Sequence, residues 1–485
     1  MIYQLIIYLL FIQISTPRFQ DNILKLILEK NENKNFMISP FGIYQVLSIL
    51  SNGATGQTQK EMLQVLYPNK NIDDTTLTLD KINSNLIQVL ENLSKEDFIV
   101  PPTTTLNIPR TTISKETKEI LQNDSSEIIE EIRDFPEDNF FENVLNREKS
   151  DYGEKNDNGE KNDNLIFNNV NGLFIKKGYN ILEEFSLKCK NLNASISELI
   201  NVSQINSFCY NNTNGKIPKC IEEIEDNVTL ILINAIYFKG NWSKPFDKIF
   251  TKKLPFQNNN NDIVEVDTMY EHFNGNEYYE DDKIQMISLP YSSKKLNFKM
   301  IIILPNKNIY SSPLNFLEEN INLNELVSKL KYTENINLYL PKFKNDFNIS
   351  LNNILKEMNM KRAFNSNAQF NKLSLIPTFI EEISQKTFIQ VDEVGTEAAA
   401  VTIVKSKIGS IYNPKEYFMY VNYSFIYMII SEEIKDSEGN YLAPFIGVVN
   451  NLEDKIYNIS ENSSYKIKYS KIFGCLYMLI MILSI

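Results

Sequence analysis

The chain has 485 residues, of which 43% are hydrophobic, so it is long enough to bury a sizeable core. Its formal net charge of −12 argues against nucleic acid or acidic lipid as a partner. Its one histidine, His272, lies in a loop-like stretch between Met269 and Asn276, and we expect an ordinary surface residue there. The sequence has no Cys/His cluster with metal-ligand spacing and no glycine-rich phosphate loop, so we expect no hydrolase triad, metal site or cofactor, and therefore no enzyme.

The amino-terminal segment is short and apolar. Residues Ile2 to Ile14 form an apolar run that ends in Ser15-Thr16-Pro17. This layout is typical of a secretory signal peptide, and we assign residues 1–16 to a cleaved leader. The run lacks the basic residues that usually precede such a segment, and the alternative is a buried first helix.

Four helices are predicted before the composition changes. Apolar residues recur at helical spacing over Phe19–Glu29, Ser39–Leu50 and Leu77–Leu93. The second of these is apolar on much of its circumference, which predicts a central position in the fold. Thr58-Gln59-Lys60-Glu61 matches a capping box and predicts another helix that begins at Thr58.

A polar, acid-rich segment follows, from about Glu96 to Asn164. It contains a tandem hexamer, Gly153–Asn158 and then Gly159–Asn164. Such a composition cannot bury enough apolar surface to offset the entropy of ordering the chain. We interpret residues 96–164 as a disordered insertion. Low-complexity expansion without function and a protein-binding role are the two explanations for it.

Ordered structure is expected to resume at Leu165. Dense apolar runs at Thr229–Phe238 and Phe298–Leu304 predict buried strands. Leu314–Leu330 and Ile349–Met358 have helical spacing instead. Because helical and strand patterns alternate without a clear linker, we predict one large α+β domain.

The cysteines and sequons bear on the compartment. Cys209 and Cys220 flank a turn-rich stretch, so a local disulfide and two buried free thiols are both consistent with the sequence. Sequons such as Asn193-Ala194-Ser195 are frequent, which is compatible with a secreted glycoprotein. Asparagine is abundant enough to produce many of them by chance.

The segment after the predicted strand Lys386–Val391 has an unusual alternation. From Thr396 onward, one face carries only uncharged and mostly small residues, and every charge falls on the other face. A strand that slides between two existing strands needs such a face, because large or charged side chains would clash or be buried unpaired. On the pattern alone, the alternative is an ordinary edge strand followed by a polar loop.

The carboxyl-terminal tail is also unusual. After a polar spacer, the apolar run Ile472–Ile485 is shorter than the ~20 residues that span a bilayer. Small residues at Asn462 and Ser463, a polar spacer and an apolar end form the layout of a lipid-anchor signal. The alternatives are a tail-anchored helix and a segment with no targeting role. Membrane association through this tail is the broader prediction.

Five separated blocks resemble the serpins, a family of serine protease inhibitors. They are Asn35–Pro40, Gly53–Thr58, Asn234–Trp242, Leu340–Phe343 and Phe445–Asn450, and the segment Glu393–Thr402 resembles the family's reactive-loop hinge. The blocks assign residues 19–451 to one serpin domain and residues 452–485 to an extension. The resemblance implies an α+β serpin fold with a large central mixed sheet and surrounding helices, second and third smaller sheets and an exposed reactive-centre loop.

The resemblance also implies a mechanism, in which a protease cleaves the loop, becomes acylated, and is trapped when the loop inserts into the central sheet. The implied hinge residues are Glu393, Gly395, Thr396, Ala398, Ala399, Ala400 and Thr402. The implied sheet-opening residues are Ser39, Asn234, Gln385 and Trp242. Gln385 replaces a histidine that is common in the family, and Gly42 replaces a small hydroxyl residue. Because glutamine both donates and accepts hydrogen bonds, we expect these two replacements to change how readily the sheet opens but not to prevent its opening.

Counting the family's usual hinge length from Glu393 places the reactive bond at Gly409–Ser410. Lys407 suits a trypsin-like protease and Tyr412 a chymotrypsin-like one, and both are alternatives for the cleaved position. The resemblance thus predicts a monomeric extracellular inhibitor, secreted or held at the outer cell surface, that forms a covalent complex with a serine protease. One alternative is a non-inhibitory serpin that acts as a carrier or binding module at the cell surface. Another is a display protein whose important part is the acidic insertion.

Overall fold

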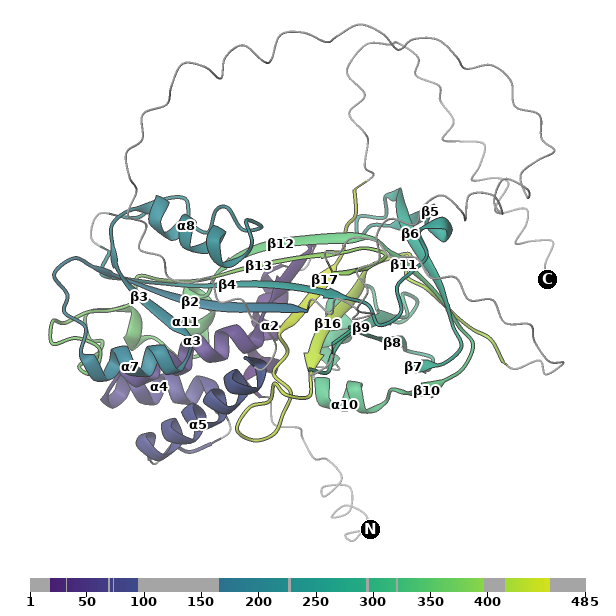
Figure 1. The fold of residues 1–485 in the computed structure, drawn as a ribbon. Helices are drawn as coiled ribbons and strands as arrows, with labels where there is room; N and C mark the ends of the chain where they lie inside the picture. Colours follow the sequence, from purple (N-terminus) through teal and green to yellow (C-terminus); the bar gives the residue numbers. More distant parts are fainter. Residues whose placement is uncertain are drawn as a thin grey trace, which may run out of the picture.

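The computed structural model describes residues 18–94, 165–396 and 415–453, except for residues 32, 69, 73, 226–227, 294–295 and 320–321. The predicted leader, insertion, most of the hinge, the reactive bond and the tail lie outside the described residues. In Figure 1, helices α3, α4, α5 and α7 lie together below a long sheet, and α8 lies above it. No helix in the described part of the chain is both long and apolar enough to cross a membrane.

The amino-terminal helices follow the predicted pattern. They are α2 (Phe19–Lys30), α3 (Pro40–Gly53), α4 (Gly56–Leu66) and α5 (Thr75–Leu93). Every residue of α3 is buried, which confirms its predicted central position. Ser39 caps α3, because its hydroxyl accepts a hydrogen bond from the Gly42 amide at 3.0 Å.

The predicted capping box at Thr58 is wrong. Helix α4 begins at Gly56, with Thr55 as its N-cap residue. The Thr58 hydroxyl instead accepts a hydrogen bond from the Gln369 amide, at 3.0 Å. The Glu61 carboxylate accepts from backbone amides near Arg362. Both side chains therefore bind distant segments of the chain, which a local motif cannot reveal.

The later helices are shorter than the pattern predicts. They are α7 (Glu183–Asn191), α8 (Val202–Asn212), α9 (Pro313–Glu319), α10 (Leu323–Ser328) and α11 (Asn352–Glu357), with 3-10 turns η1 (Lys248–Phe250) and η2 (Arg362–Phe364). The single helix predicted over Leu314–Leu330 is divided into α9 and α10. Asn322 begins a new helix there by accepting a hydrogen bond from the Glu325 amide.

The strands of the described residues form three sheets, which confirms the predicted α+β class. The sheet with the most strands has seven, in the order β1 (Phe36–Ile38), β17 (Phe445–Val449), β16 (Phe425–Ser431), β9 (Phe298–Pro305), β8 (Ile284–Pro290), β7 (Asn276–Glu280) and β10 (Lys331–Thr333). The four-stranded sheet has the order β15 (Tyr417–Tyr420), β11 (Ile336–Pro341), β6 (Ile263–Phe273) and β5 (Lys252–Gln257).

The six-stranded sheet is the long sheet of Figure 1. Its order is β12 (Phe343–Ser350), β13 (Glu382–Val391), β14 (Gly395–Thr396), β4 (Leu230–Asn241), β2 (Ile166–Lys176) and β3 (Ala194–Leu199). It is mixed, because β4 runs parallel to β13 but antiparallel to β2. The single histidine, expected in a loop, lies in β6, opposite Asn337 of β11. That expectation was wrong because Tyr270, Glu271 and His272 are all half-buried, so no clear apolar alternation marks this part of the strand.

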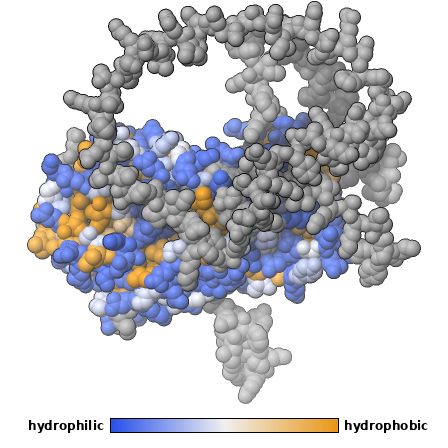
Figure 2. All heavy atoms as spheres, in the orientation of Figure 1, coloured by the Kyte–Doolittle hydropathy of each residue, from blue (hydrophilic) through white to orange (hydrophobic). Residues whose placement is uncertain are grey.

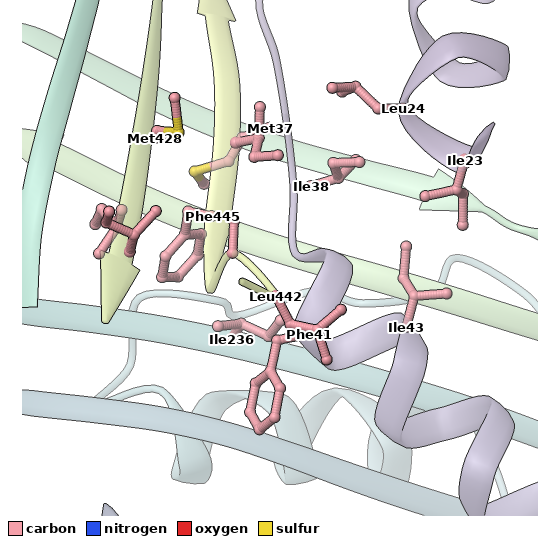
Figure 3. Packing of buried hydrophobic residues seen from close by; sticks show 14 of the residues in the cluster. Ile23, Leu24, Met37, Ile38, Phe41, Ile43, Ile236, Met428, Leu442 and Phe445 are labelled. Carbon is pink, nitrogen blue, oxygen red and sulfur yellow. The ribbon is translucent and has the colours of Figure 1, made fainter. Parts of the chain in front are cut away.

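A continuous apolar core joins the sheets to the central helix. Figure 3 shows α3 beside β1 and the strands of the seven-stranded sheet, with the long strands of the six-stranded sheet across them. Fully buried side chains from each element meet there: Met37, Ile38, Phe41, Ile43, Ile236, Met428 and Phe445. The described surface seen in Figure 2 is mainly hydrophilic, with hydrophobic residues in separate groups.

Helix α8 covers the opposite face of the six-stranded sheet. Ile205 of α8 belongs to a second apolar cluster with Ile233 and Tyr237 of β4 and Phe388 of β13. Cys209 of α8 is joined by a disulfide to Cys220, in the segment that leads to β4. Of the two alternatives, a local disulfide and two free thiols, the structure has the disulfide. Cys189 is buried and free.

Candidate functional site between strands β4 and β13

Strands β4 and β13 are close partners along one part of their length and are separated along another. They pair directly, in parallel, from Ile231 opposite Glu382 to Tyr237 opposite Phe388. Beyond this stretch, β14 lies between them: Thr396 pairs with Gly240 on one side and Val391 on the other. β14 is antiparallel to both neighbours. The sheet therefore already holds the start of an extra strand.

The turn that leads into β14 is held by hydrogen bonds. The Asp392 carboxylate accepts from the backbone amides of Val394 and Gly395, at 3.0 and 3.4 Å. The indole Nε1 of Trp242 donates to the Asp392 carbonyl at 3.0 Å, and the Trp242 amide donates to the Val394 carbonyl at 2.8 Å. Trp242, predicted where the sheet opens, thus contacts the turn directly.

Gly395 is required by the close approach of two backbones. A Cβ atom at this position would lie 2.1 Å from the Gly240 carbonyl oxygen and 2.7 Å from the Asn241 Cα. The glycines with positive φ among the described residues are at other positions. Gly395, the predicted hinge glycine, therefore provides space between β14 and β4 and does not form a left-handed turn.

The side chain of Thr396 points into the protein. It is fully buried, and its hydroxyl lies 2.8 Å from the Tyr291 hydroxyl. The Tyr291 ring in turn stacks on Trp242, with ring centroids 4.5 Å apart. Burial raises the pKa of Tyr291, so its hydroxyl stays neutral and can donate to Thr396.

Glu393 fixes the other side of the turn. Its carboxylate is only 4% exposed, and it accepts from Thr251 Oγ1 at 2.9 Å and lies 3.1 Å from Lys342 Nζ. Burial opposes the charged form, but hydrogen bonds from its own amide, Thr251 and Lys342 outweigh burial and lower the pKa. The ionised carboxylate therefore anchors the turn beside β12.

A buried hydrogen bond joins β4 to β13 below β14. Gln385 Nε2 donates to Asn234 Oδ1 at 2.8 Å and to the Ser39 carbonyl at 3.1 Å. Gln385 Oε1 accepts from the Ser39 amide at 2.8 Å. All three residues are fully buried. The structure thus brings together these three predicted sheet-opening residues, whereas Trp242 lies at the turn.

The hydrogen bonds continue beyond this trio. Asn234 Nδ2 donates to Asn169 Oδ1 and Asn171 Oδ1 of β2, at 2.7 and 2.8 Å. Asn169 Nδ2 donates to Gln45 Oε1 of α3 at 2.7 Å. We call the whole set the amide relay: Ser39, Gln385, Asn234, Asn169, Asn171 and Gln45. A Cβ at Gly42 would lie 2.4 Å from Asn234 Oδ1, so this glycine leaves room for the relay.

Sequence reasoning missed three members of the relay, as well as Tyr291, Thr251 and Lys342. Gln45 could have been noticed, because it is a polar residue in a helix that is apolar nearly all round. The remaining predicted residues lie outside the described part of the chain. These are Ala398, Ala399, Ala400, Thr402, Lys407, Gly409, Ser410, Tyr412, Asn462 and Ser463.

Comparison with known proteins agrees with this geometry. A family model described as "Serpin (serine protease inhibitor)" matches residues 15–128 and 110–437. The chain is 27% identical to macrophage plasminogen activator inhibitor 2 of Mus musculus, over 81% of this chain and 89% of that protein. It is 34% identical to leukocyte elastase inhibitor of Equus caballus, over 49% of this chain and 67% of that protein.

Solved structures share the fold. The thermophilic serpin tengpin in its native state has a TM-score of 0.64 at 23% identity, over 90% of this chain and 93% of that one. Thyroxine-binding globulin in complex with thyroxine has a TM-score of 0.64 at 21% identity, over 90% of this chain and 96% of that one. At these identities the likeness shows the arrangement of helices and sheets alone.

Proposed function

This chain belongs to the serpin family, and we propose that it is a suicide-substrate inhibitor of a serine protease. Its relatives include proteins named as protease inhibitors. The single observation that carries the proposal is β14, a strand that has begun to form between β4 and β13. An inhibitor that traps its protease by loop insertion needs this opening.

The register of β14 defines what complete insertion would do. Thr402 is six residues beyond Thr396, and Asn234 and Gln385 are each six residues before Gly240 and Val391. Continuing the register therefore places Thr402 directly between Asn234 and Gln385. One parallel ladder of seven residue pairs would be replaced by two antiparallel ladders, which are slightly more stable per residue. The uninserted form thus stores free energy as an unmade strand.

Both faces of the inserting strand would suit their surroundings. Residues paired across a sheet share a face, so the positions that alternate with Thr396 would lie on the same side as the amide relay. These positions are uncharged: Ala398, Ala400 and Thr402. The other face would lie beneath α8, in the apolar cluster of Tyr237 and Phe388. Its residues there are Ala399, Val401 and Ile403.

The chemical step belongs to the protease. Its serine oxygen attacks the carbonyl carbon of the reactive bond, and the proton passes through its histidine to the departing amine. An ester then joins the protease to the loop, and a new amino terminus is released. We place the bond at Gly409–Ser410, with Lys407 for a trypsin-like and Tyr412 for a chymotrypsin-like target. Insertion before water hydrolyses the ester leaves the covalent complex.

We further propose that the protein acts outside the cell. The Cys209–Cys220 disulfide supports this, because disulfides persist in oxidising compartments. Residues 1–16 would direct secretion, and residues 19–451 would form the inhibitory domain with residues 96–164 as its insertion. The extension of residues 452–485 would attach the protein to the outer surface. A non-inhibitory carrier is the alternative, favoured only by the fold shared with thyroxine-binding globulin.

A panel of trypsin- and chymotrypsin-like proteases tests the proposal. We expect a complex that survives SDS, a released carboxyl-terminal fragment that begins at the cleaved bond, and a higher melting temperature after cleavage of the loop. The Thr396→Arg variant should be cleaved as a simple substrate, because an arginine cannot be buried without a partner at the position of Thr396 and would keep β14 out of the sheet. Absence of a complex with every protease, together with an unchanged melting temperature after cleavage, would favour the carrier.

A further inference from the structure

A row of aromatic rings crosses the outer face of the four-stranded sheet. Tyr420 of β15, Tyr339 of β11 and Tyr270 of β6 occupy paired register positions. The ring centroids of Tyr420 and Tyr339 are 4.5 Å apart, and those of Tyr339 and Tyr270 are 4.8 Å apart. Phe418 lies 6.1 Å from Tyr420, and Phe250 of η1 lies 6.0 Å from Tyr270. We call these five residues the aromatic platform.

Three rings of the platform are exposed to solvent. Phe418 is 43% exposed, Tyr420 47% and Phe250 50%, whereas Tyr339 and Tyr270 between them are half-buried. The alternate residues of the same strands are fully buried on the opposite face: Met269, Leu338 and Met419. An antiparallel or mixed sheet with one packed face usually presents polar residues on the other. A row of aromatic rings with three exposed members is therefore the exception, and aromatic residues are enriched in protein interfaces.

The rings are held in place by polar contacts beside them. Tyr270 Oη donates to Asn337 Oδ1 at 2.9 Å, and His272 Nδ1 lies 3.2 Å from the same oxygen. Gln285 Nε2 donates to the Phe418 carbonyl at 2.9 Å. Stacked rings with such support lose little conformational entropy when a partner covers them. The platform is thus preorganised for binding.

The platform lies at the base of the segment that carries the reactive bond. Residues 397–414 lie between β14 and β15, and β15 begins at Tyr417. A chain extends at most ~3.6 Å per residue, so Tyr412 lies within roughly 20 Å of Phe418, and Gly409 within roughly 30 Å. A protease domain of roughly 230 residues has a radius of gyration of about 17 Å. The body of a protease bound at this bond therefore comes within reach of the platform.

We propose that the aromatic platform is a second docking surface for the target protease. The inference rests on the inhibitory function proposed above. The partner surface it fits is an apolar patch beside the protease's active-site cleft. The rings of Phe418 and Tyr420 would cover this patch. This contact acts on the first, non-covalent encounter and leaves strand insertion unchanged, because the platform belongs to a different sheet from β4 and β13.

The test uses the full-length protein and the protease that the panel identifies. The double variant Phe418→Ala/Tyr420→Ala is compared with Tyr210→Ala, which removes a 52% exposed tyrosine from α8 on another part of the molecule. A protease whose nucleophilic serine is replaced by alanine gives the Kd of the encounter without any chemistry. We expect this Kd to rise about tenfold or more for the platform variant and less than twofold for Tyr210→Ala.

Active protease then separates encounter from trapping. The second-order rate of complex formation should fall with the Kd, whereas the limiting rate at high protease, the stoichiometry and the rise in melting temperature on cleavage stay unchanged. A second variant, Phe418→Gln/Tyr420→Gln, retains more side-chain volume on the strand and should give the same loss. An unchanged Kd in both variants overturns the platform proposal, as does wild-type self-association that these variants abolish. Absence of any covalent complex in the wild type instead overturns the inhibitory function.

Discussion

In the proposed mechanism, loop insertion must break hydrogen bonds of the amide relay, and Gln385→Leu tests this. The substitution keeps a side chain of similar size but removes three hydrogen bonds, to Asn234 Oδ1 and to the amide and carbonyl of Ser39. The Ser39 carbonyl keeps a bond from the Ile43 amide, at 3.1 Å. Two fully buried polar atoms, Asn234 Oδ1 and the Ser39 nitrogen, would lose these partners.

The expected loss follows from those two atoms. Each buried polar atom without a partner costs about 1–3 kcal/mol, so the free energy of unfolding of the intact protein should fall by about 4 kcal/mol. For a chain of this length, such a loss lowers the melting temperature by about 5 °C. Gln57→Leu, at an exposed position in α4, is the matched control and should change stability by less than about 0.5 kcal/mol.

The loop-cleaved protein supplies the decisive comparison. If insertion places Thr402 between Asn234 and Gln385, their hydrogen bond is already absent in the cleaved form. Gln385→Leu should then cost the cleaved protein about 1–3 kcal/mol less than it costs the intact protein. Urea unfolding of both forms, with and without the substitution, measures the difference. Equal losses in the two forms would refute the proposed register, and no loss in the intact form would refute the role of the relay.

Three further predictions test other parts of the structure. Gly395→Ala should displace β14 from the Gly240 carbonyl, and the loop should then be cleaved without trapping, as gel analysis would show; normal trapping would contradict this. Cys209→Ser/Cys220→Ser should lower the free energy of unfolding by about 3 kcal/mol in urea, and reductant should destabilise the wild type but not the variant. Burial raises the pKa of Asp21 to about 6, so the native protein binds the extra proton more readily and the wild type should lose stability as pH rises from about 4 to 6. Asp21→Asn should therefore be more stable than the wild type in urea at pH 7.5 and equal to it at pH 4, and equal stability at both would contradict the shift.

Much of the fold could be predicted, because strong apolar periodicity decided the central elements. Helix α3 and strand β4 were expected from their apolar runs, and both lie where the chain is buried on nearly all sides. The errors lie where a side chain bonds to a distant segment. Glu61 accepts from amides 300 residues away, so its capping pattern was misleading. The stretch around His272 was taken for a loop for a different reason, because its half-buried residues show no clear apolar alternation.

Within the candidate site, too, some residues could be expected from the sequence and others could not. The start of the hinge was expected from a local alternation and from its resemblance to the serpin hinge, and Glu393, Gly395 and Thr396 lie in the described residues, whereas Ala398 to Thr402 lie outside them and stay a prediction. The relay could not be predicted, because its partners are far apart in the chain: Gln45 and Asn169 are separated by 124 residues, and Asn169 and Asn234 by 65. Only the pairing of β2 with β4, and their packing against α3, brings those amides together.

The relative positions of hinge and relay determine how the trap would work. Glu393, Trp242 and Tyr291 hold the first residues of β14 in place, so the start of insertion needs no large rearrangement. The relay closes the sheet six residues further on, at Asn234 and Gln385. Changes at the hinge should therefore decide whether the loop enters at all. Changes in the relay should instead determine the rate at which a loop that has entered the sheet inserts completely. This rate decides whether the protease is trapped before water hydrolyses the ester.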